Sequence, residues 1–459
     1  MGVKLCVLGG CGARSAFLTK SLATQARRIQ VDHIVLMDVD QQRLDTYGEL
    51  ARHIANRVNP ELQLDLTLDA REAMMDADYI ITTIRAGGDE ARAFDEKICM
   101  EHGVLGQETT GAGGFAMALR SLPVLRDYCA IAAQVAKPGH IIFNFTNPSG
   151  IVTQGLRDLG YSNVYGICDA PSGFHRQLAR IIGRNEEDVE MTCYGLNHLS
   201  WFREIRVDGK DVTDALLANP ELYRKSEMRL FSPETIETLG GVMPNEYLYF
   251  YYDRIRVLQS IRGSGVPRGQ YIAQVNAALE QELAEMDVKQ EPERAFEAYM
   301  RHYAMRENAY FSAESGQKRP ETMEAVSLED FLAQEDAGGY AAVALQFILA
   351  ITEGRKTRMV LSVPNQGAID GIADDDIVEI ICTIDRDGTH PLPIGKIDEM
   401  QLIQMRAIKY FERGAVKAAL EGDRAAAVRA MYIHPLVNDL SVARELAQIF
   451  FERYHIDRS

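Results

Sequence analysis

Residues 4–38, KLCVLGGCGARSAFLTKSLATQARRIQVDHIVLMD, decide the fold of the N-terminal part of the chain. They begin with a short apolar run typical of a β-strand, which ends in a glycine loop at residues 9–12. A helix is predicted over residues 15–28, and the apolar run at residues 33–37 predicts a second strand that ends at Asp38. This order of strand, glycine loop, helix, strand and acidic residue predicts the first βαβ unit of a dinucleotide-binding domain.

The glycine loop and the acidic residue together indicate a nucleotide cofactor. Gly9, Gly10 and Gly12 let the backbone approach a pyrophosphate, and the N-terminus of the following helix favours its negative charge. Asp38 is placed to accept hydrogen bonds from the adenosine ribose and to repel a 2′-phosphate, which favours NAD over NADP. The alternative is a glycine turn that binds no ligand.

The rest of the chain divides into two patterns. Strands alternate with helices up to about residue 170, which predicts a parallel, doubly wound sheet of Rossmann type. Beyond that point antiparallel strands and long helices predict a mixed α+β domain. We therefore expect an NAD-binding Rossmann domain at residues 1–168 and an α+β catalytic and oligomerisation domain at residues 169–459, similar overall to lactate and malate dehydrogenases. The further predicted strands are 79–84, 141–145, 164–167, 188–194, 202–207 and 376–384, and the further predicted helices are 121–136, 267–286, 400–422 and 436–454.

Composition excludes several classes of function. The net charge of −17 argues against nucleic acid and anionic membranes as partners, although a few local arginines would suffice for a small anionic substrate. The seven cysteines are widely spread and odd in number, which favours free thiols in the cytoplasm over a secreted disulfide framework. No signal peptide is expected at the N-terminus. The longest apolar stretch, residues 340–351, is too short to span a bilayer and predicts a buried helix.

A few side chains are candidates for chemistry, each with a structural alternative. Cys168 follows a predicted strand directly, and His198 follows another. A residue of either type is more often buried for structural reasons. Two protein ligands alone are also too few to complete the coordination of a metal. Arg85, Arg92 and Arg268 would suit a phosphate or carboxylate, but composition alone favours ordinary surface charge. Tyr247 lies in an aromatic segment in which most rings must pack in the core.

Four segments, taken together and in this order, resemble glycoside hydrolase family 4, the NAD- and metal-dependent 6-phosphoglycosidases. The resemblance runs through nearly the whole chain. Two positions depart from the family pattern: Cys11 stands where a third consecutive glycine is usual, and Ala170 stands where methionine usually follows the aspartate. The segments are GVLGQETTG at 103–111, NFTNP at 144–148, CDAP at 168–171 and GLNH at 195–198.

The resemblance implies a role for each candidate residue outside the glycine loop. Cys168 and His198 match the ligands of a divalent metal, usually manganese, although thiolate and imidazole suit zinc or iron equally well. Tyr247 matches the catalytic base, and Asp169 is the candidate acid. The implied residues for the sugar and its 6-phosphate are Arg92, Asn147 and, less closely matched, Arg268.

The implied reaction is hydrolysis of a 6-phosphoglycoside by a redox route. NAD oxidises C3 of the sugar, Tyr247 removes the C2 proton, the C1 oxygen leaves with help from Asp169, water adds, and NADH returns the hydride. Because an aspartate follows Cys168, we expect 6-phospho-α-glucosides such as maltose 6′-phosphate, with 6-phospho-β-glucosides as the alternative. A lactate- or malate-type dehydrogenase is the alternative from another class, and an NAD-sensing module is a more distant one. A homodimer or homotetramer is expected.

Overall fold

The computed structural model describes residues 2–317, 319, 322–335 and 341–456. Its first unit is the predicted one: β1 (Val3–Leu8) leads through the glycine loop into α1 (Ser15–Gln25) and β2 (Val31–Met37). The two strands are parallel neighbours, with Leu8 opposite Met37. The four residues at the C-terminal end of each strand are buried, as expected for a parallel sheet covered on both faces.

Six parallel strands form the Rossmann part of one nine-stranded sheet, in the order β6-β5-β4-β1-β2-β3. The sheet does not end at β6, because three antiparallel strands from the C-terminal half extend it beyond that edge. A segment far along the chain thus completes the sheet that the N-terminal segment begins. The further strands are β3 (Gln63–Thr67), β4 (Tyr79–Thr82), β5 (Ile141–Asn144), β6 (Val164–Gly166), β11 (Thr357–Pro364), β12 (Ile377–Asp385) and β13 (Gly388–Pro391).

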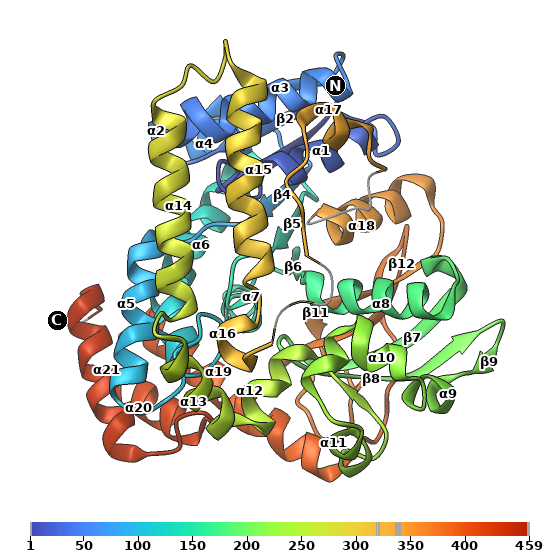
Figure 1. Ribbon diagram of the computed structural model, residues 1–459, viewed down its shortest axis with the longest axis vertical. Coiled ribbons are helices and arrows are strands. Elements are labelled where there is room, and N and C mark those ends of the chain that lie inside the picture. The colour runs from blue at the N-terminus through green and yellow to red at the C-terminus, as the bar shows by residue number, and fades with distance from the viewer. Residues whose placement is uncertain (1, 318, 320–321, 336–340, 457–459) are drawn as a thin grey trace.

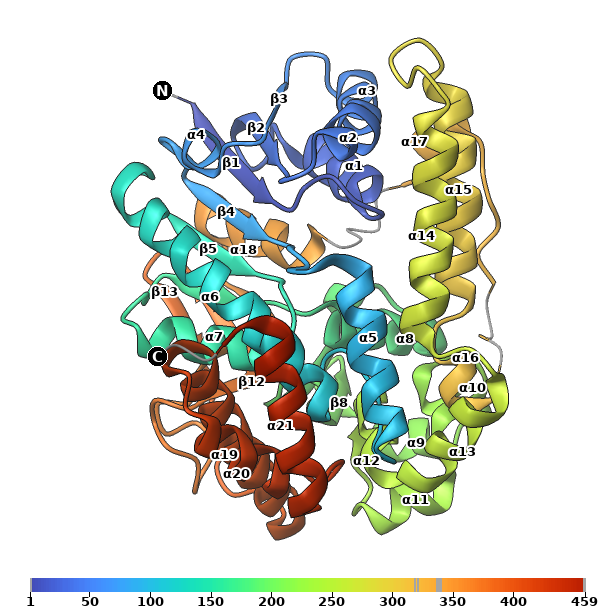
Figure 2. The same ribbon diagram turned by 90° about the vertical axis from the view of Figure 1, so that its left-hand side faces the viewer.

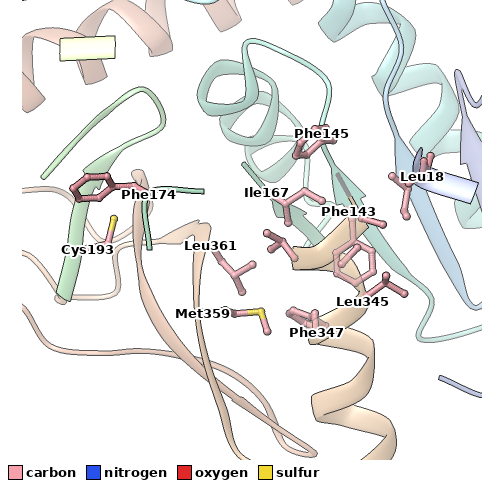
Figure 3. Packing of buried hydrophobic residues seen from close by; sticks show 14 of the residues in the cluster. Leu18, Phe143, Phe145, Ile167, Phe174, Cys193, Leu345, Phe347, Met359 and Leu361 are labelled. Atoms are coloured by element: carbon pink, nitrogen blue, oxygen red, sulfur yellow. The ribbon is translucent and has the colours of Figure 1, made fainter. Parts of the chain in front are cut away.

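Helices cover both faces of this sheet (Figure 1). On one face α18 (Ala342–Glu353) places Phe347 against Phe143 of β5, with ring centroids 5.1 Å apart and nearly perpendicular planes. Met359 and Leu361 of β11 lie beside the same cluster (Figure 3). The predicted buried helix at 340–351 therefore exists, although Tyr340 lies outside the described residues. Among the described residues no helix is long and apolar enough to cross a membrane.

The other face is covered by α6 together with helices from the C-terminal end of the chain (Figure 2). α6 begins at Gly111, ten residues before its predicted start. The prediction missed this first part because its glycines are poor helix formers in isolation. Their absence of side chains is needed here: a Cβ on Gly113 would lie 2.3 Å from the carbonyl oxygen of Gln107. The helices of this face are α4 (Ala70–Met74), α6 (Gly111–Val135), α7 (Ser149–Asp158), α19 (Glu399–Glu421), α20 (Arg424–Ile433) and α21 (Leu440–Tyr454).

A smaller antiparallel sheet follows the Rossmann strands. β7 (Val189–Leu196) and β8 (Leu199–Val207) form the predicted antiparallel pair, and β10 (Met243–Pro244) extends it. The expected turn after β8 is also present, since Asp208 and Gly209 both have positive φ angles of 51° and 74°. The remaining elements near it are α8 (Asp169–Ile182), β9 (Lys210–Asp211), α9 (Thr213–Leu217), α10 (Pro220–Lys225), α11 (Pro233–Thr238), α12 (Tyr249–Tyr252) and α13 (Arg254–Ser264).

Two long helices, α14 (Arg268–Ala284) and α15 (Pro292–Asn308), run side by side and reach back to the N-terminal segment (Figures 1 and 2). We call them the helical pair. α14 packs on α5 (Gly88–Glu101), and α15 contacts α3 (Glu49–Val58). The hydroxyl of Tyr299 in α15 donates to the carbonyl of Ala13, directly after the glycine loop, at 2.7 Å. The helical pair therefore forms one wall beside the predicted nucleotide site.

Candidate active site

One cavity of ≈ 790 Å³ lies at the carboxyl ends of the parallel strands. The glycine loop, the β7–β8 hairpin and the helical pair also line it. This is the place where doubly wound sheets bind ligands, because loops from neighbouring strands diverge there. Every residue that the sequence singled out for the site lines this cavity: Gly9, Gly10, Gly12, Asp38, Arg85, Arg92, Asn147, Cys168, Asp169, His198, Tyr247 and Arg268.

The glycine loop has the geometry that a close backbone approach requires. Gly9 has a φ of +78°, and a Cβ there would lie 2.9 Å from the carbonyl oxygen of Thr83. The backbone N–H groups of Gly9 and Gly10 both donate to the carbonyl of Met37, at 2.8 and 3.0 Å, which fixes the loop to the end of β2. Asp38 follows at once and is buried in the same cavity. The loop and the acid thus fit the adenosine and pyrophosphate of a dinucleotide.

Cys168 and His198 meet although 30 residues separate them. Cys168 follows β6 and caps α8, whereas His198 lies in the two-residue turn between β7 and β8 with a φ of +62°. The Sγ atom of Cys168 lies 3.7 Å from Nε2 of His198. Metal–sulfur and metal–nitrogen bonds are about 2.3 and 2.0–2.1 Å in zinc sites, so one ion of similar size can contact both atoms.

The hydrogen bonds around His198 leave its Nε2 free to act as a ligand. Thr109 Oγ1 donates to Oε1 of Gln107 at 2.7 Å, so its hydroxyl proton is already used. The same oxygen lies 3.0 Å from His198 Nδ1 and must therefore accept a proton from it. Burial lowers the pKa of His198 to about 3, which keeps the ring neutral. The Nε2 lone pair then faces Cys168, as a metal ligand requires.

The thiol of Cys168 is not activated by its protein surroundings alone. Burial and the carboxylate of Glu379 raise its pKa well above the ordinary value. A cation at this position would offset both effects, which fits a metal better than a free nucleophile. Among the described residues no group of three or more His, Cys, Asp or Glu side chains could hold a metal. The pair therefore fits a metal only if the substrate or water supplies further ligands.

A buried carboxylate from the C-terminal half holds the His198 turn in place. Glu379 of β12 accepts hydrogen bonds from Asn197 Nδ2 and Ser200 Oγ, both at 3.0 Å. Burial raises the pKa of Glu379 to about 7. The antiparallel extension of the Rossmann sheet thus supports the histidine through its neighbours, since Asn197 is the other residue of the turn and Ser200 lies just after it.

Tyr247 lies face to face with His198. The two ring centroids are 3.7 Å apart and the planes differ by 8°. The backbone N–H of Tyr247 donates to Oδ1 of Asn245 at 3.0 Å, which fixes the start of the short helix that carries it. Burial and the neighbouring Glu246 raise the pKa of the Tyr247 hydroxyl well above its usual value. Its phenolate therefore needs a nearby cation, and the Cys168–His198 pair is the adjacent place for one.

Asp169 and Asn147 line the same cavity as Cys168. Asp169 is the first residue of α8, and its Oδ2 lies 3.5 Å from Nη1 of Arg14. Nearly half of its side chain is exposed, so the carboxyl group can reach solvent or a ligand. Asn147 follows β5 and precedes Pro148 in a cis peptide bond.

Arg92 is buried within an ionic cluster, so its guanidinium group is already paired with carboxylates. Its Nε donates to Glu96 Oε1 at 2.8 Å, and its Nη1 lies 3.1 Å from Glu108 Oε1. Arg85 pairs with the other oxygen of Glu108. Although burial alone would raise it, Arg85 and Arg92 lower the pKa of Glu108, so the carboxylate is charged. A phosphate bound here must share Arg92 with two carboxylates.

Arg268 lies close to this cluster but is held separately. Its Nη1 donates to the carbonyl of Ala309 at 2.7 Å, and its guanidinium lies 5.2 Å from the ring centre of Tyr310. The next backbone N–H, that of Gly269, donates to Glu96 Oε2 at 2.6 Å. Glu96 thus links Arg92 to the backbone next to Arg268, and both arginines line the cavity.

Three residues that line the cavity or contact its candidate ligands were not predicted from the sequence. Tyr310 donates toward Tyr247 at 3.3 Å and Glu246 at 3.5 Å, with its single proton available to one of them. Burial and the nearby Glu227 raise the pKa of Glu246 to about 8. Glu246 adjoins Tyr247 in the sequence, so its place beside the candidate base was predictable, whereas Tyr310 lies in no motif. Thr109 belongs to the quoted segment 103–111, yet its bond to His198 has no sequence signature.

The fold and the cavity are those of a Rossmann-class protein, with a cysteine–histidine pair beside the predicted nucleotide site. A family model described as family 4 glycosyl hydrolase matches residues 4–184, and one for the family 4 C-terminal domain matches residues 193–437. The chain therefore belongs to family 4 of the glycosyl hydrolases. The family resemblance and the enzyme class inferred from the sequence are confirmed.

Relatives of similar length include proteins named as β-glucosidases and proteins named as α-glucosidases. The 6-phospho-beta-glucosidase BglT of Thermotoga maritima is 26% identical over 455 residues, which is 98% of each chain. The phospho-alpha-glucosidase PagL of Clostridium acetobutylicum is 27% identical and covers 98% of this chain and 97% of its own. Identity therefore does not separate the two linkages.

Solved structures confirm the fold. The 6-phospho-beta glucosidase of Thermotoga maritima with manganese, NAD+ and glucose-6-phosphate has a TM-score of 0.80 at 25% identity, covering 99% of this chain and 98% of its own. A 6-phospho-alpha-glucosidase from gut microorganisms with NAD and Mn2+ has a TM-score of 0.76 at 25% identity, with the same coverage. A lactate dehydrogenase from a deep-sea metagenome, at 12% identity, covers 91% of this chain and 99% of its own with a TM-score of 0.52, so the expected dehydrogenase-like fold is also confirmed.

Proposed function

We propose that the protein hydrolyses 6-phosphoglucosides with NAD and a divalent metal, manganese in the first instance. The observation that supports this most strongly is the shared cavity, in which the Cys168–His198 pair and Tyr247 lie beside the glycine loop. The relatives named above are phosphoglucosidases, the two solved structures contain NAD and manganese, and the one from Thermotoga maritima also contains glucose-6-phosphate. A lactate- or malate-type dehydrogenase would need a catalytic histidine with its own acid partner, whereas Nδ1 of His198 contacts the hydroxyl of Thr109.

The cofactors supply chemistry that side chains lack: NAD reversible hydride transfer at C3, and the metal Lewis acidity beside C2 and C3. Gly9, Gly10, Gly12 and Asp38 would hold the dinucleotide, and Cys168 and His198 the metal. Once C3 is oxidised, the C2 hydrogen becomes acidic.

The protein residues then move protons. Tyr247 takes the C2 proton, for which its ring is held rigidly against His198. Asp169 gives a proton to the leaving oxygen at C1, because it lies on the cavity wall next to Cys168 with its carboxyl group accessible. After elimination, water would add to C1 while C2 regains a proton, and return of the hydride from bound NADH to C3 would leave no net redox change.

A panel of chromogenic 6-phosphoglycosides with NAD and manganese tests the function directly. The expected result is release of the chromophore while NADH absorbance stays flat. Accumulation of NADH in proportion to product would identify a dehydrogenase instead. Hydrolysis of unphosphorylated sugars or uronates alone would contradict the proposed substrate class.

We expect Arg92→Ala to weaken binding of the phosphorylated sugar by about tenfold to a hundredfold, the worth of a charge-assisted hydrogen bond. NAD binding should change far less. Because the substitution also removes one ion-pair partner from each of Glu96 and Glu108, Arg92→Lys serves as the matched variant that keeps the charge but loses the planar fork. The measurements are KM for a 6-phosphoglucoside and, as a check on folding, the thermal unfolding midpoint. Equal KM values in both variants and the wild type would exclude Arg92 from phosphate binding.

We further propose a preference for the α-anomer, because an aspartate follows Cys168. Maltose 6′-phosphate should be cleaved faster than cellobiose 6′-phosphate; both have poor leaving groups that need an acid. Asp169→Asn should reduce cleavage of the maltose derivative by about 10²-fold or more, the usual worth of a general acid. Faster cleavage of the cellobiose derivative, or full activity of the asparagine variant, would reverse the assignment.

A cytoplasmic location and a homodimer or homotetramer complete the proposal. They rest on the free cysteines and on the expected oligomerisation role of residues 169–459. Light scattering of the purified protein measures the assembly directly. A monomer at working concentration would contradict the expected oligomer.

A further inference from the structure

The end of the cavity that holds Asp38 contains an ion pair between distant parts of the chain. Arg43 closes the short helix α2 (Gln41–Arg43), shortly after Asp38. Its Nη2 lies 3.0 Å from Oε1 of Glu280 in α14, and about a third of each side chain is exposed, 35% and 34%. Asp38, Arg43 and Glu280 all line the cavity. The arginine that follows β2 is therefore neutralised by a glutamate from the helical pair.

Acidic and basic residues at this place in a dinucleotide site distinguish NAD from NADP. An acid at the end of β2 binds the ribose hydroxyls of NAD, whereas a nearby arginine accommodates the 2′-phosphate of NADP. This chain has both residues, Asp38 and Arg43, and the acid alone would not prevent a flexible arginine from turning toward a phosphate. Glu280 occupies that arginine and adds a second carboxylate to the same end of the cavity, which further disfavours a dianionic phosphate.

The helix that carries Glu280 is held in position by contacts along the helical pair. Tyr299 bonds to Ala13 beside the glycine loop, as described above, and Asn276 in α14 bonds to Asp89 of α5. Lys289, in the turn between α14 and α15, lies 3.4 Å from Oε1 of Glu49. With the helical pair fixed at three places, the backbone that carries Glu280 is fixed beside the cavity, where the side chain meets Arg43.

We infer that Glu280 is a cofactor-selectivity residue, which binds Arg43 and thereby prevents the cavity from accepting the 2′-phosphate of NADP. The inference rests on the proposed dinucleotide site. It assigns the choice between NAD and NADP to the second half of the chain as well as to Asp38. No role in the chemical steps is assigned to either Arg43 or Glu280.

Titration calorimetry of the purified full-length protein with NAD+ and with NADP+ tests this assignment. Glu280→Gln should tighten NADP+ binding by about tenfold or more, since one charge-assisted contact is gained, and should change NAD+ binding by less than about threefold. Arg43→Ala in the Glu280→Gln background should abolish the gain. Glu282→Gln is the matched control: it removes the same charge from the same helix, but Glu282 pairs with Arg301 and does not line the cavity.

Each outcome decides the question. Unchanged NADP+ affinity in Glu280→Gln, an equal gain in Glu282→Gln, or a gain that survives removal of Arg43 would overturn the inference. Loss of NAD+ binding in folded Glu280→Gln would also overturn it, because the glutamate would then hold the common adenosine. A wild-type protein that binds neither dinucleotide would instead refute the proposed function, on which the inference depends.

Discussion

Replacing Cys168 by serine is expected to remove the divalent metal from the purified protein and to reduce hydrolysis by about 10³-fold or more. The estimate follows from the several kcal/mol that a Lewis acid contributes to a developing negative charge. A serine hydroxyl is a much weaker ligand than a thiolate, and His198 alone would not retain the ion. NAD binding should persist, because the glycine loop follows β1 whereas Cys168 follows β6, and two strands, β4 and β5, lie between them.

Metal content by atomic absorption and NAD affinity by calorimetry are the two measurements that separate these effects. Cys129→Ser is the matched control, since Cys129 is a buried thiol in α6 that does not line the cavity. It should retain metal and activity per folded molecule. Full activity of Cys168→Ser, or of the wild type after exhaustive chelation, would exclude the proposed metal site.

The features that could be predicted from the sequence are those set by local patterns. The unit β1–α1–β2 has its strand, glycines and helix within one short segment, so its period and turn residues suffice. The same holds for the β7–β8 hairpin and for α14, whose apolar face was visible at residues 267–286. The resemblance to family 4 then supplied the site residues, and all of them line one cavity.

The features that could not be predicted depend on contacts between distant segments. Strand β12 was expected, but nothing local shows that β11 would add antiparallel to the edge strand β6 through Ser362 and Gly166. That addition brings Glu379 under the turn of His198. The protonation of Nδ1 in His198 likewise follows from two hydrogen bonds of Thr109, which exist only after folding.

The division into domains illustrates the same limit. The expected boundary at residue 168 falls where the alternating pattern ends, and it stays a prediction. The nine-stranded sheet nevertheless takes strands from both sides of that position, and α19 to α21 cover its N-terminal half. A pattern along the sequence shows where one type of connection ends, but not where the later strands will pair.

Tyr247→Phe is expected to reduce turnover by about 10²- to 10⁴-fold, the usual worth of a general base, with the fold intact. The substitution removes one hydroxyl group and keeps the ring that stacks on His198 at 3.7 Å. Metal and NAD binding should therefore stay close to wild type. The loss should appear in kcat, because the hydroxyl acts on the C2 hydrogen and not in holding the sugar.

Isotopic labelling at C2 shows whether this hydroxyl moves the proton. In the wild type, substrate deuterated at C2 should show a primary isotope effect or exchange its label with solvent. Tyr247→Phe should lose solvent exchange together with turnover, whereas Tyr249→Phe, a nearby tyrosine outside the cavity, should lose neither. Exchange that continues at the wild-type rate in Tyr247→Phe would show that another group removes the C2 proton, and Tyr310, which lies 3.3 Å from the Tyr247 hydroxyl, would be the next residue to replace.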